Sequence, residues 1–259
     1  MTTATALPAV ESEPPRPSLA RLTLVELRKM TDTRSGRWLL VLIALTAVAM
    51  TPVMLLAAPE EERTLAGFFS AALTGVSLLL PVLGILSVTQ EWSQRTTLTT
   101  FALVPARHRV VSAKLAAGSL LGAVFVATAL AVAAVGRGLA EVLGRSDGAW
   151  TIAPSRVATT VLFAVIAVFS GAAFGMLFMN SPLAIVLYFA LPTAWSVLTE
   201  TVTALKDAAG WLDTNRTLNP LLEEGVTWEE WARAGTSLVV WLLIPLLAGL
   251  VRLMRREVK

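Results

Sequence analysis

Cysteine is absent from the chain, and histidine occurs once, as His108. The first absence excludes disulfide bonds and thiolate metal sites, and a single imidazole argues against a multi-histidine metal site or a histidine-based catalytic relay. Charged side chains are scarce as well: they make up 15% of the residues, whereas soluble domains carry about a quarter. No lysine follows a glycine, so the chain lacks a G-x-x-x-x-G-K-[ST] phosphate loop and cannot bind ATP in that manner.

The sequence contains several long runs of apolar residues. Apolar residues make up 55% of the chain, and its mean hydropathy is +0.69, which is typical of a polytopic membrane protein. A membrane helix needs about 20 predominantly apolar residues. Runs of this length cover Trp38–Ala58, Phe68–Val88, Val110–Val135, Val157–Met179, Pro182–Leu205 and Thr236–Met254. The sequence therefore predicts an all-α integral membrane protein with six transmembrane helices. Pro182 is well placed to open the fifth of them after a very tight turn.

The N-terminal region divides into two parts before the six-span domain of residues 37–259. Residues 1–18 are rich in Pro, Thr and Ala, and we expect them to be disordered. Residues 19–36 predict an amphipathic helix lying in the headgroup region. Its apolar stripe comprises Ala20, Thr23, Leu24, Leu27, Met30 and Thr31, opposite Arg21, Arg28, Lys29 and Asp32. The alternative is a basic flank that only fixes topology.

Basic residues are distributed unevenly over the two faces that six spans create. The face with both termini holds 14 basic and 6 acidic residues, a net charge of +8, and the opposite face has a net charge of −5. The positive-inside rule predicts that both termini are cytoplasmic. Arginine outnumbers lysine by 17 to 4, which favours a bacterial source and hence the bacterial cytoplasmic membrane.

The loop between the second and third spans reads TQEWSQRTTLTTFALVPARHRVVSAK over residues 89–114. Glu91 to Val104 contains no Gly or Pro and predicts one helix, which Pro105 would end. Aliphatic, aromatic and hydroxyl side chains on this helix favour docking into a groove of a cytoplasmic partner. Arg107, His108 and Arg109 follow where anionic headgroups or an acidic partner could meet them.

Five residues of this loop carry a resemblance to a known family; they are, in order, Glu91, Thr96, Pro105, Arg107 and Lys114. The chain resembles the permease subunit of type 2 ABC exporters. The resemblance covers nearly the whole chain: an interfacial helix, six spans, a coupling helix between spans two and three, and a long external segment between spans five and six. It implies that the loop seats in a separate P-loop ATPase subunit. The residues expected to make this coupling are Glu91, Arg95, Thr96, Leu98, Phe101, Pro105 and Arg107.

The same resemblance implies a dimer of permeases with two ATPase copies, so that ATP and Mg²⁺ bind the partner and no cofactor binds this chain. It places Glu91 at the start of the coupling helix, tied to neighbouring basic groups. The alternative is an N-terminal helix acid that the helix dipole favours by about 0.3–1 kcal/mol. We expect no nucleic-acid partner, because the basic residues follow the membrane face.

The spans carry no charged residue in their middle, which argues against an ion-coupled carrier and favours an amphiphilic or lipid-like substrate. Polar side chains that could line a path are Thr128, Tyr188, Thr193 and Ser196. Packing is the alternative for these, as for Gly118-x-x-x-Gly122 and Gly171-x-x-x-Gly175. Three prolines, Pro81, Pro192 and Pro245, are expected to kink spans two, five and six.

The outer segment Lys206–Gly235 predicts short helices, with a capping box formed by Thr227 and Glu230. Together these features predict the membrane subunit of an ATP-driven exporter, without enzymatic activity of its own. A non-transporting membrane protein, such as an immunity or sensory scaffold, is the alternative. An intramembrane enzyme is poorly supported, since the spans contain no paired acids, HExxH or serine constellation.

Overall fold

The computed structural model describes residues 17–94, 96, 104, 106–146, 148–223 and 225–256, and these residues contain helices and loops but no strand. Six helical stretches among them are long and apolar enough to cross a membrane. They are Arg34–Ala57 (α2), Leu65–Ala72 with Thr74–Ser93 (α3 and α4), Arg107–Val142 (α6), Pro154–Phe178 (α7), Ser181–Thr201 (α8), and Trp228–Arg255. The fold is therefore that of an all-α, multi-pass membrane protein, as predicted.

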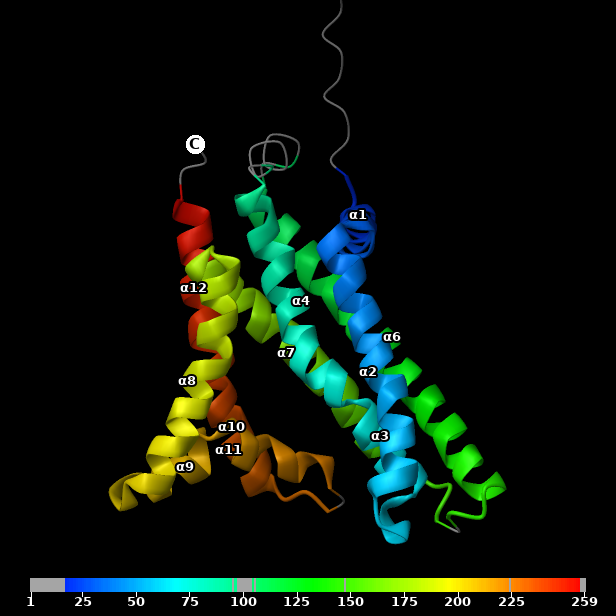
Figure 1. The fold of residues 1–259 in the computed structure, drawn as a ribbon. Helices are drawn as coiled ribbons and strands as arrows, with labels where there is room; N and C mark the ends of the chain where they lie inside the picture. The colour runs from blue at the N-terminus through cyan, green and yellow to red at the C-terminus, as the bar shows by residue number, and fades with distance from the viewer. Residues whose placement is uncertain are drawn as a thin grey trace, which may run out of the picture.

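The spans form two groups that meet along α7. In Figure 1, α2, α4, α6 and α7 pack together, while α8 and the last span lie beside α7 and diverge from α2 and α6 toward the lower end. The described chain begins and ends at the same, upper end of the bundle (Figure 1). We call this the basic end, because α1 and the arginines of the last span lie there.

Small residues let the central helices approach closely. A Cβ at Gly171 of α7 would overlap the carbonyl oxygen of Pro81 in α4. Gly118 and Gly122 of α6 pack against Val168 and Ala164 of α7. The glycine motifs therefore serve packing between α4, α6 and α7. Large apolar side chains fill the space around these contacts; among those that are fully buried are Ile43, Phe68, Phe69, Leu80, Leu83, Val126 and Val168.

Prolines and caps shape the remaining helices. Asn180 accepts a hydrogen bond from the backbone N–H of Leu183, and Pro182 occupies the first turn of α8, so the tight turn is confirmed. Pro52, Pro81 and Pro192 lie inside helices. In the last span, α11 (Trp228–Leu238) passes through a π-helical turn at Val239–Leu243 into α12 (Ile244–Arg255), whose first turn contains Pro245.

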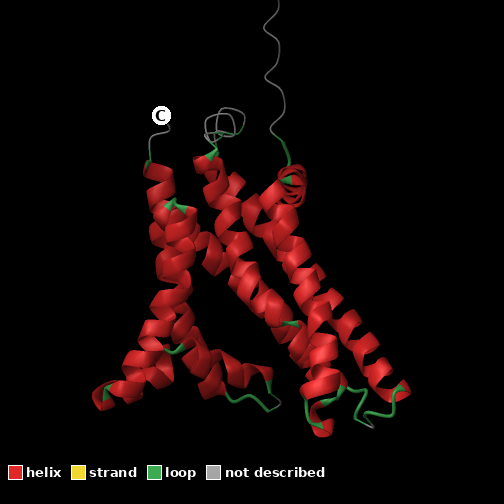
Figure 2. Cartoon of the chain, in the orientation of Figure 1, coloured by secondary structure: helices red, strands yellow, loops and turns green. Residues whose placement is uncertain are grey.

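Short helices occupy the lower end of the bundle (Figure 2). They are Glu60–Glu62 (η1), Thr203–Leu205 (η2), Lys206–Leu212 (α9), Thr214–Leu218 (α10) and Asn219–Leu222 (η3). The capping box at Thr227 is confirmed: its hydroxyl accepts from the Glu230 N–H, and its own N–H donates to the Glu230 carboxylate at 2.7 Å. The prediction of short helices between the last two spans is therefore confirmed.

Span three is longer than its apolar run. We expected Val110–Val135, but α6 extends from Arg107 to Val142. Arg137, beyond the expected run, consequently lies inside the helix near its end, as Lys114 does near its start, and both are buried. Arg137 donates two hydrogen bonds to the Gly148 carbonyl, and its guanidinium lies 4.9 Å from the centre of the Trp150 ring. Charge is thus absent from the middle of this span but present at both ends.

Candidate functional site at the basic end

Helix α1 (Leu19–Asp32) lies crosswise to the spans on the flank of the bundle (Figure 1). Ser18 caps its first turn by accepting from the Arg21 N–H at 3.2 Å. Thr33 ends α1 in extended conformation and caps α2 by accepting from the Gly36 N–H, also at 3.2 Å. A Cβ at Gly36 would overlap the carbonyl oxygen of Met30, so glycine permits this sharp elbow. The elbow sets the direction of α1 relative to α2.

The face that α1 buries overlaps the predicted apolar stripe only in part: Met30 of the stripe is buried, and Leu27 packs against the core. Glu26 and Met30 are the buried residues of α1, whereas Leu24 in the predicted stripe is 49% exposed. The stripe was inferred from hydrophobic spacing alone, which counts a glutamate against burial. Glu26 is nevertheless buried, because two lysines neutralise it there.

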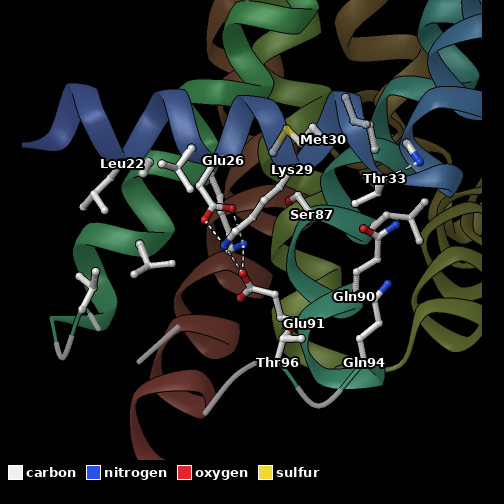
Figure 3. Close-up of a pocket in the computed structure, with 18 residues that line it drawn as sticks. Leu22, Glu26, Lys29, Met30, Thr33, Ser87, Gln90, Glu91, Gln94 and Thr96 are labelled. Carbon is white, nitrogen blue, oxygen red and sulfur yellow. Dashed lines mark hydrogen bonds and ion pairs between the residues drawn. The ribbon is translucent and has the colours of Figure 1, made fainter. Parts of the chain in front are cut away.

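Four charged side chains from three helices meet beneath α1 (Figure 3). Glu26 accepts from Lys29 at 2.7 Å and from Lys114 at 2.6 Å. Glu91, in the last turn of α4, accepts from the same two lysines at 2.8 and 2.9 Å. We call Glu26, Lys29, Glu91 and Lys114 the charge quartet. It joins α1, α4 and α6 through alternating charges whose formal sum is zero.

Burial makes the charge quartet a strong constraint on the positions of these helices. The side chains of Glu26 and Lys114 are 6% and 5% exposed, and that of Lys29 is 41% exposed. Burial by itself would lower the pKa of Lys29, but hydrogen bonds to Glu26 and Glu91 and the charges of both carboxylates raise it above the usual 10.5. Lys29 therefore stays protonated at neutral pH.

Glu91 ends a helix rather than starting one. Helix α4 continues to Ser93, and the N–H of Thr96 donates to the Glu91 carbonyl at 3.0 Å. The interpretation as an N-terminal acid favoured by the helix dipole is therefore wrong, since a carboxylate at a C-terminus is disfavoured. The two lysines offset that cost. Arg95, Leu98, Phe101 and Pro105 lie outside the described residues, as does most of the predicted helix Glu91–Val104.

A cavity of about 550 Å³ lies beside the charge quartet and under α1 (Figure 3). Apolar side chains from α1, α4 and α6 form most of its wall, and Gln90, Gln94 and Thr96 add polar groups where α4 ends. The site thus combines an apolar wall with a balanced set of charges. Metal binding is not indicated: no group of three His, Asp or Glu side chains suited to a metal ion occurs in the part of the chain that the structure describes.

Arg107 contacts the end of the last span. Its guanidinium donates to the carbonyls of Leu253 at 2.7 Å and Arg256 at 2.8 Å. Arg109 donates to the Pro17 carbonyl at 2.7 Å. Both guanidinium groups thus hold segments of this chain together, and the contact with headgroups or a partner stays a prediction. Carbonyls at a helix C-terminus lack partners within the helix, which explains the attraction of Arg107.

The structure brings together two of the four side chains expected along a path. Tyr188 and Thr193 line a second cavity of about 340 Å³, between α4, α7, α8 and the short outer helices. Thr128 is exposed on α6 and donates to its own helix at the Val124 carbonyl, and Ser196 is half-buried on α8. Neither Thr128 nor Ser196 lines this cavity. Its lining contains no charged residue.

The sequence analysis did not predict a role for Glu26, which belongs neither to the predicted apolar stripe nor to the charged face opposite it. One signal could have found it: Glu26 and Lys29 are spaced i, i+3, as side chains that pair on one helix face are. Lys114 was noted as a motif residue but not as a partner of Glu91. No protein-family model matches the chain, and no curated protein matches it significantly.

Proposed function

We propose that the chain is the membrane-spanning permease subunit of an ATP-binding cassette exporter. In this proposal two copies form the path for an amphiphilic or lipid-like substrate, and each binds a separate ATPase subunit that holds ATP and Mg²⁺. The basic end faces the cytoplasm, in line with the positive-inside rule. Residues 94–106, between α4 and α6, then contact the ATPase.

One observation carries the proposal. Glu91 lies just before that loop and Lys114 lies two turns after it, and the charge quartet ties both to α1. A force on the loop is therefore transmitted to α4, α6 and α1 together, because separating them would expose unpaired charges in a largely buried place. A loop that only joined two spans would not need this bracing.

The character of the spans supports the same proposal. The charged residues of α6 lie near its ends, and the cavity lined by Tyr188 and Thr193 has no charged lining. Ion-coupled carriers place carboxylates or basic groups within the membrane to bind the driving ion. A transporter driven by a separate ATPase needs no such groups, and an uncharged cavity suits a substrate with apolar character.

The test is affinity purification of the tagged chain from its native membrane in mild detergent, with identification of the proteins that copurify. We expect a P-loop ATPase in equal amount. We also expect Glu91→Gln to reduce its recovery several-fold, because loss of one charge unbalances the quartet beside the docking loop. Glu60→Gln, an exposed glutamate at the opposite end, is the matched control and should leave recovery unchanged.

Two results would contradict the proposal. Purification of the chain without an ATPase in several mild detergents would favour a non-transporting scaffold. Equal ATPase recovery with Glu91→Gln and wild type would leave the partner in place but refute the coupling role of this end of α4.

A further inference from the structure

Arginines at the basic end fall into two classes. The first class is engaged with the chain itself. Arg107 and Arg109 bind backbone carbonyls, Arg252 donates to the Leu177 carbonyl, and the Arg256 guanidinium lies 4.7 Å from the centre of the Trp92 ring. These side chains cap helix ends and hold segments together. Their charge is used within the fold.

The second class is exposed and, apart from Arg255 of α12, lies on two consecutive helices, α1 and the start of α2. Arg21 and Arg28 on α1, and Arg34 and Arg37 in the first turns of α2, are exposed, and no hydrogen bond or ion pair of their side chains occurs within the described part of the chain. We call these four residues the arginine patch. Asp32 is the one exposed acidic residue between Pro17 and Trp38, so the patch keeps a strong positive charge.

Apolar side chains accompany the arginine patch. Leu24 is 49% exposed between Arg21 and Arg28, and Trp38 is 68% exposed one residue after Arg37. Below Trp38, the exposed surface of α2 continues with Val41, Leu42 and Leu45. The patch thus adjoins a surface that the hydrocarbon of a membrane covers, and Trp38 lies at the junction, as tryptophans at membrane interfaces do.

The direction of α1 completes the geometry. The helix lies crosswise to the spans on the flank of the bundle (Figure 1). Its inner face is fixed by Glu26 and Met30, so Arg28, half a turn away from Glu26, lies on the side opposite the bundle. A crosswise helix with one face on protein and the other exposed at this height faces the headgroup layer.

We propose that the arginine patch is a binding site for anionic phospholipid. The guanidinium groups bind the phosphates through paired N–H donors, and Leu24 and Trp38 contact the upper parts of the acyl chains. Lipid is the occupant because the patch is continuous with the membrane-facing surface of α2, where a soluble protein or a nucleic acid has no access. The proposal does not depend on transport activity.

The test measures lipids that remain bound to the purified full-length chain. The chain is reconstituted in bilayers of equimolar phosphatidylglycerol and phosphatidylcholine, extracted in mild detergent, washed, and analysed by mass spectrometry. We expect phosphatidylglycerol to be enriched over phosphatidylcholine. Each double variant, Arg21→Gln with Arg28→Gln and Arg34→Gln with Arg37→Gln, should lower the enrichment roughly thirtyfold, since two arginines near an anionic surface together add about 2 kcal/mol of attraction.

A matched control separates local binding from net charge. Lys206→Gln with Arg255→Gln also removes two exposed cations, one at each end of the bundle away from the patch, and should keep the enrichment. Arg→Lys at the four patch positions should keep part of it. No enrichment in the wild type, or equal loss in the control, would overturn the proposal. If a patch variant elutes as aggregate, the Arg→Lys variants test the proposal instead. Equal phosphatidylglycerol enrichment in those variants and in the wild type at every salt concentration would contradict binding of phosphate through paired guanidinium N–H donors.

Discussion

Glu26 of α1 and Lys114 of α6 form an ion pair of 2.6 Å, with both side chains almost fully buried although each lies near the end of the bundle. A buried ion is costly unless it is paired, and removal of one partner leaves the other charge without compensation. Substitution of either residue is therefore expected to weaken the seating of α1 on the bundle.

We predict that Lys114→Met lowers the free energy of unfolding by about 3–5 kcal/mol, because two carboxylates then share only Lys29. Adding Glu26→Leu should restore much of the loss, since Glu91 and Lys29 remain as a balanced pair. Unfolding in detergent can be followed by tryptophan fluorescence as temperature rises. Additive effects of the two substitutions would show that the residues are not coupled.

The second prediction concerns pH. The pKa of Lys29 is raised in the folded chain, so its contribution to stability is complete below its usual value of 10.5 and is lost as pH rises through the higher folded pKa. The stability difference between wild type and Lys29→Met should therefore be constant from neutral pH to mildly alkaline pH and shrink at strongly alkaline pH. Melting curves measured across this range test it. A difference that already changes between pH 6 and 9 would contradict the assigned cause.

The sequence predicted those parts of the fold that depend on composition and local spacing. Six apolar runs gave six spans, and Thr227 with Glu230 gave a capping box. The π-helical turn at Val239–Leu243 and the extra length of α6 could not be read in this way. Arg137 would end an apolar run, yet it lies buried in α6 because the Gly148 carbonyl and the Trp150 ring satisfy it.

The candidate site was predictable only in part, for the same reason. Glu91 was singled out from its position in the loop, but its partners are distant in sequence: Lys29 is 62 residues away. Glu26 pairs with Lys114 across 88 residues. Hydrophobic periodicity predicts that the apolar side of a helix is buried. It contains no information about a lysine, distant in sequence, that pairs with a glutamate on that helix. The face of α1 was therefore predicted only in part, since Met30 is buried as expected but the burial of Glu26 was missed, and the helix ends at Asp32 rather than at residue 36.

The third prediction concerns the packing of α4 on α7. Gly171→Ala places a Cβ against the Pro81 carbonyl oxygen, and backbone atoms cannot move aside as a flexible side chain can. We expect a loss of at least about 1–3 kcal/mol in the free energy of unfolding. Gly235→Ala is the matched control: it lies inside α11 with open space around it, and should be neutral or stabilising by up to about 1 kcal/mol. If both substitutions had the same effect, the contact between the two helices would not be the cause.

The fourth prediction separates the path candidates by chemistry, using the natural absence of cysteine. A single cysteine introduced at any position is the only thiol in the chain. Maleimides react with the thiolate, which forms where water reaches the sulfur and not in hydrocarbon. Thr193→Cys lines the uncharged cavity of about 340 Å³, and Thr128→Cys projects from the exposed side of α6 outside it. We therefore expect N-ethylmaleimide, applied to membranes at neutral pH, to label Thr193→Cys at least tenfold faster than Thr128→Cys.

Two controls make this comparison decisive. Ser196→Cys lies on the same helix as Thr193 but outside the cavity lining, and should react slowly, so that position on α8 alone does not explain the result. Labelling after denaturation in detergent should equalise the three variants, which shows that each thiol is intact. Equal rates for Thr193→Cys and Thr128→Cys in the membrane would mean that water does not distinguish the cavity from the lipid-facing surface. In that case neither Tyr188 nor Thr193 lines an aqueous path, and the path would have to be sought elsewhere in the assembly.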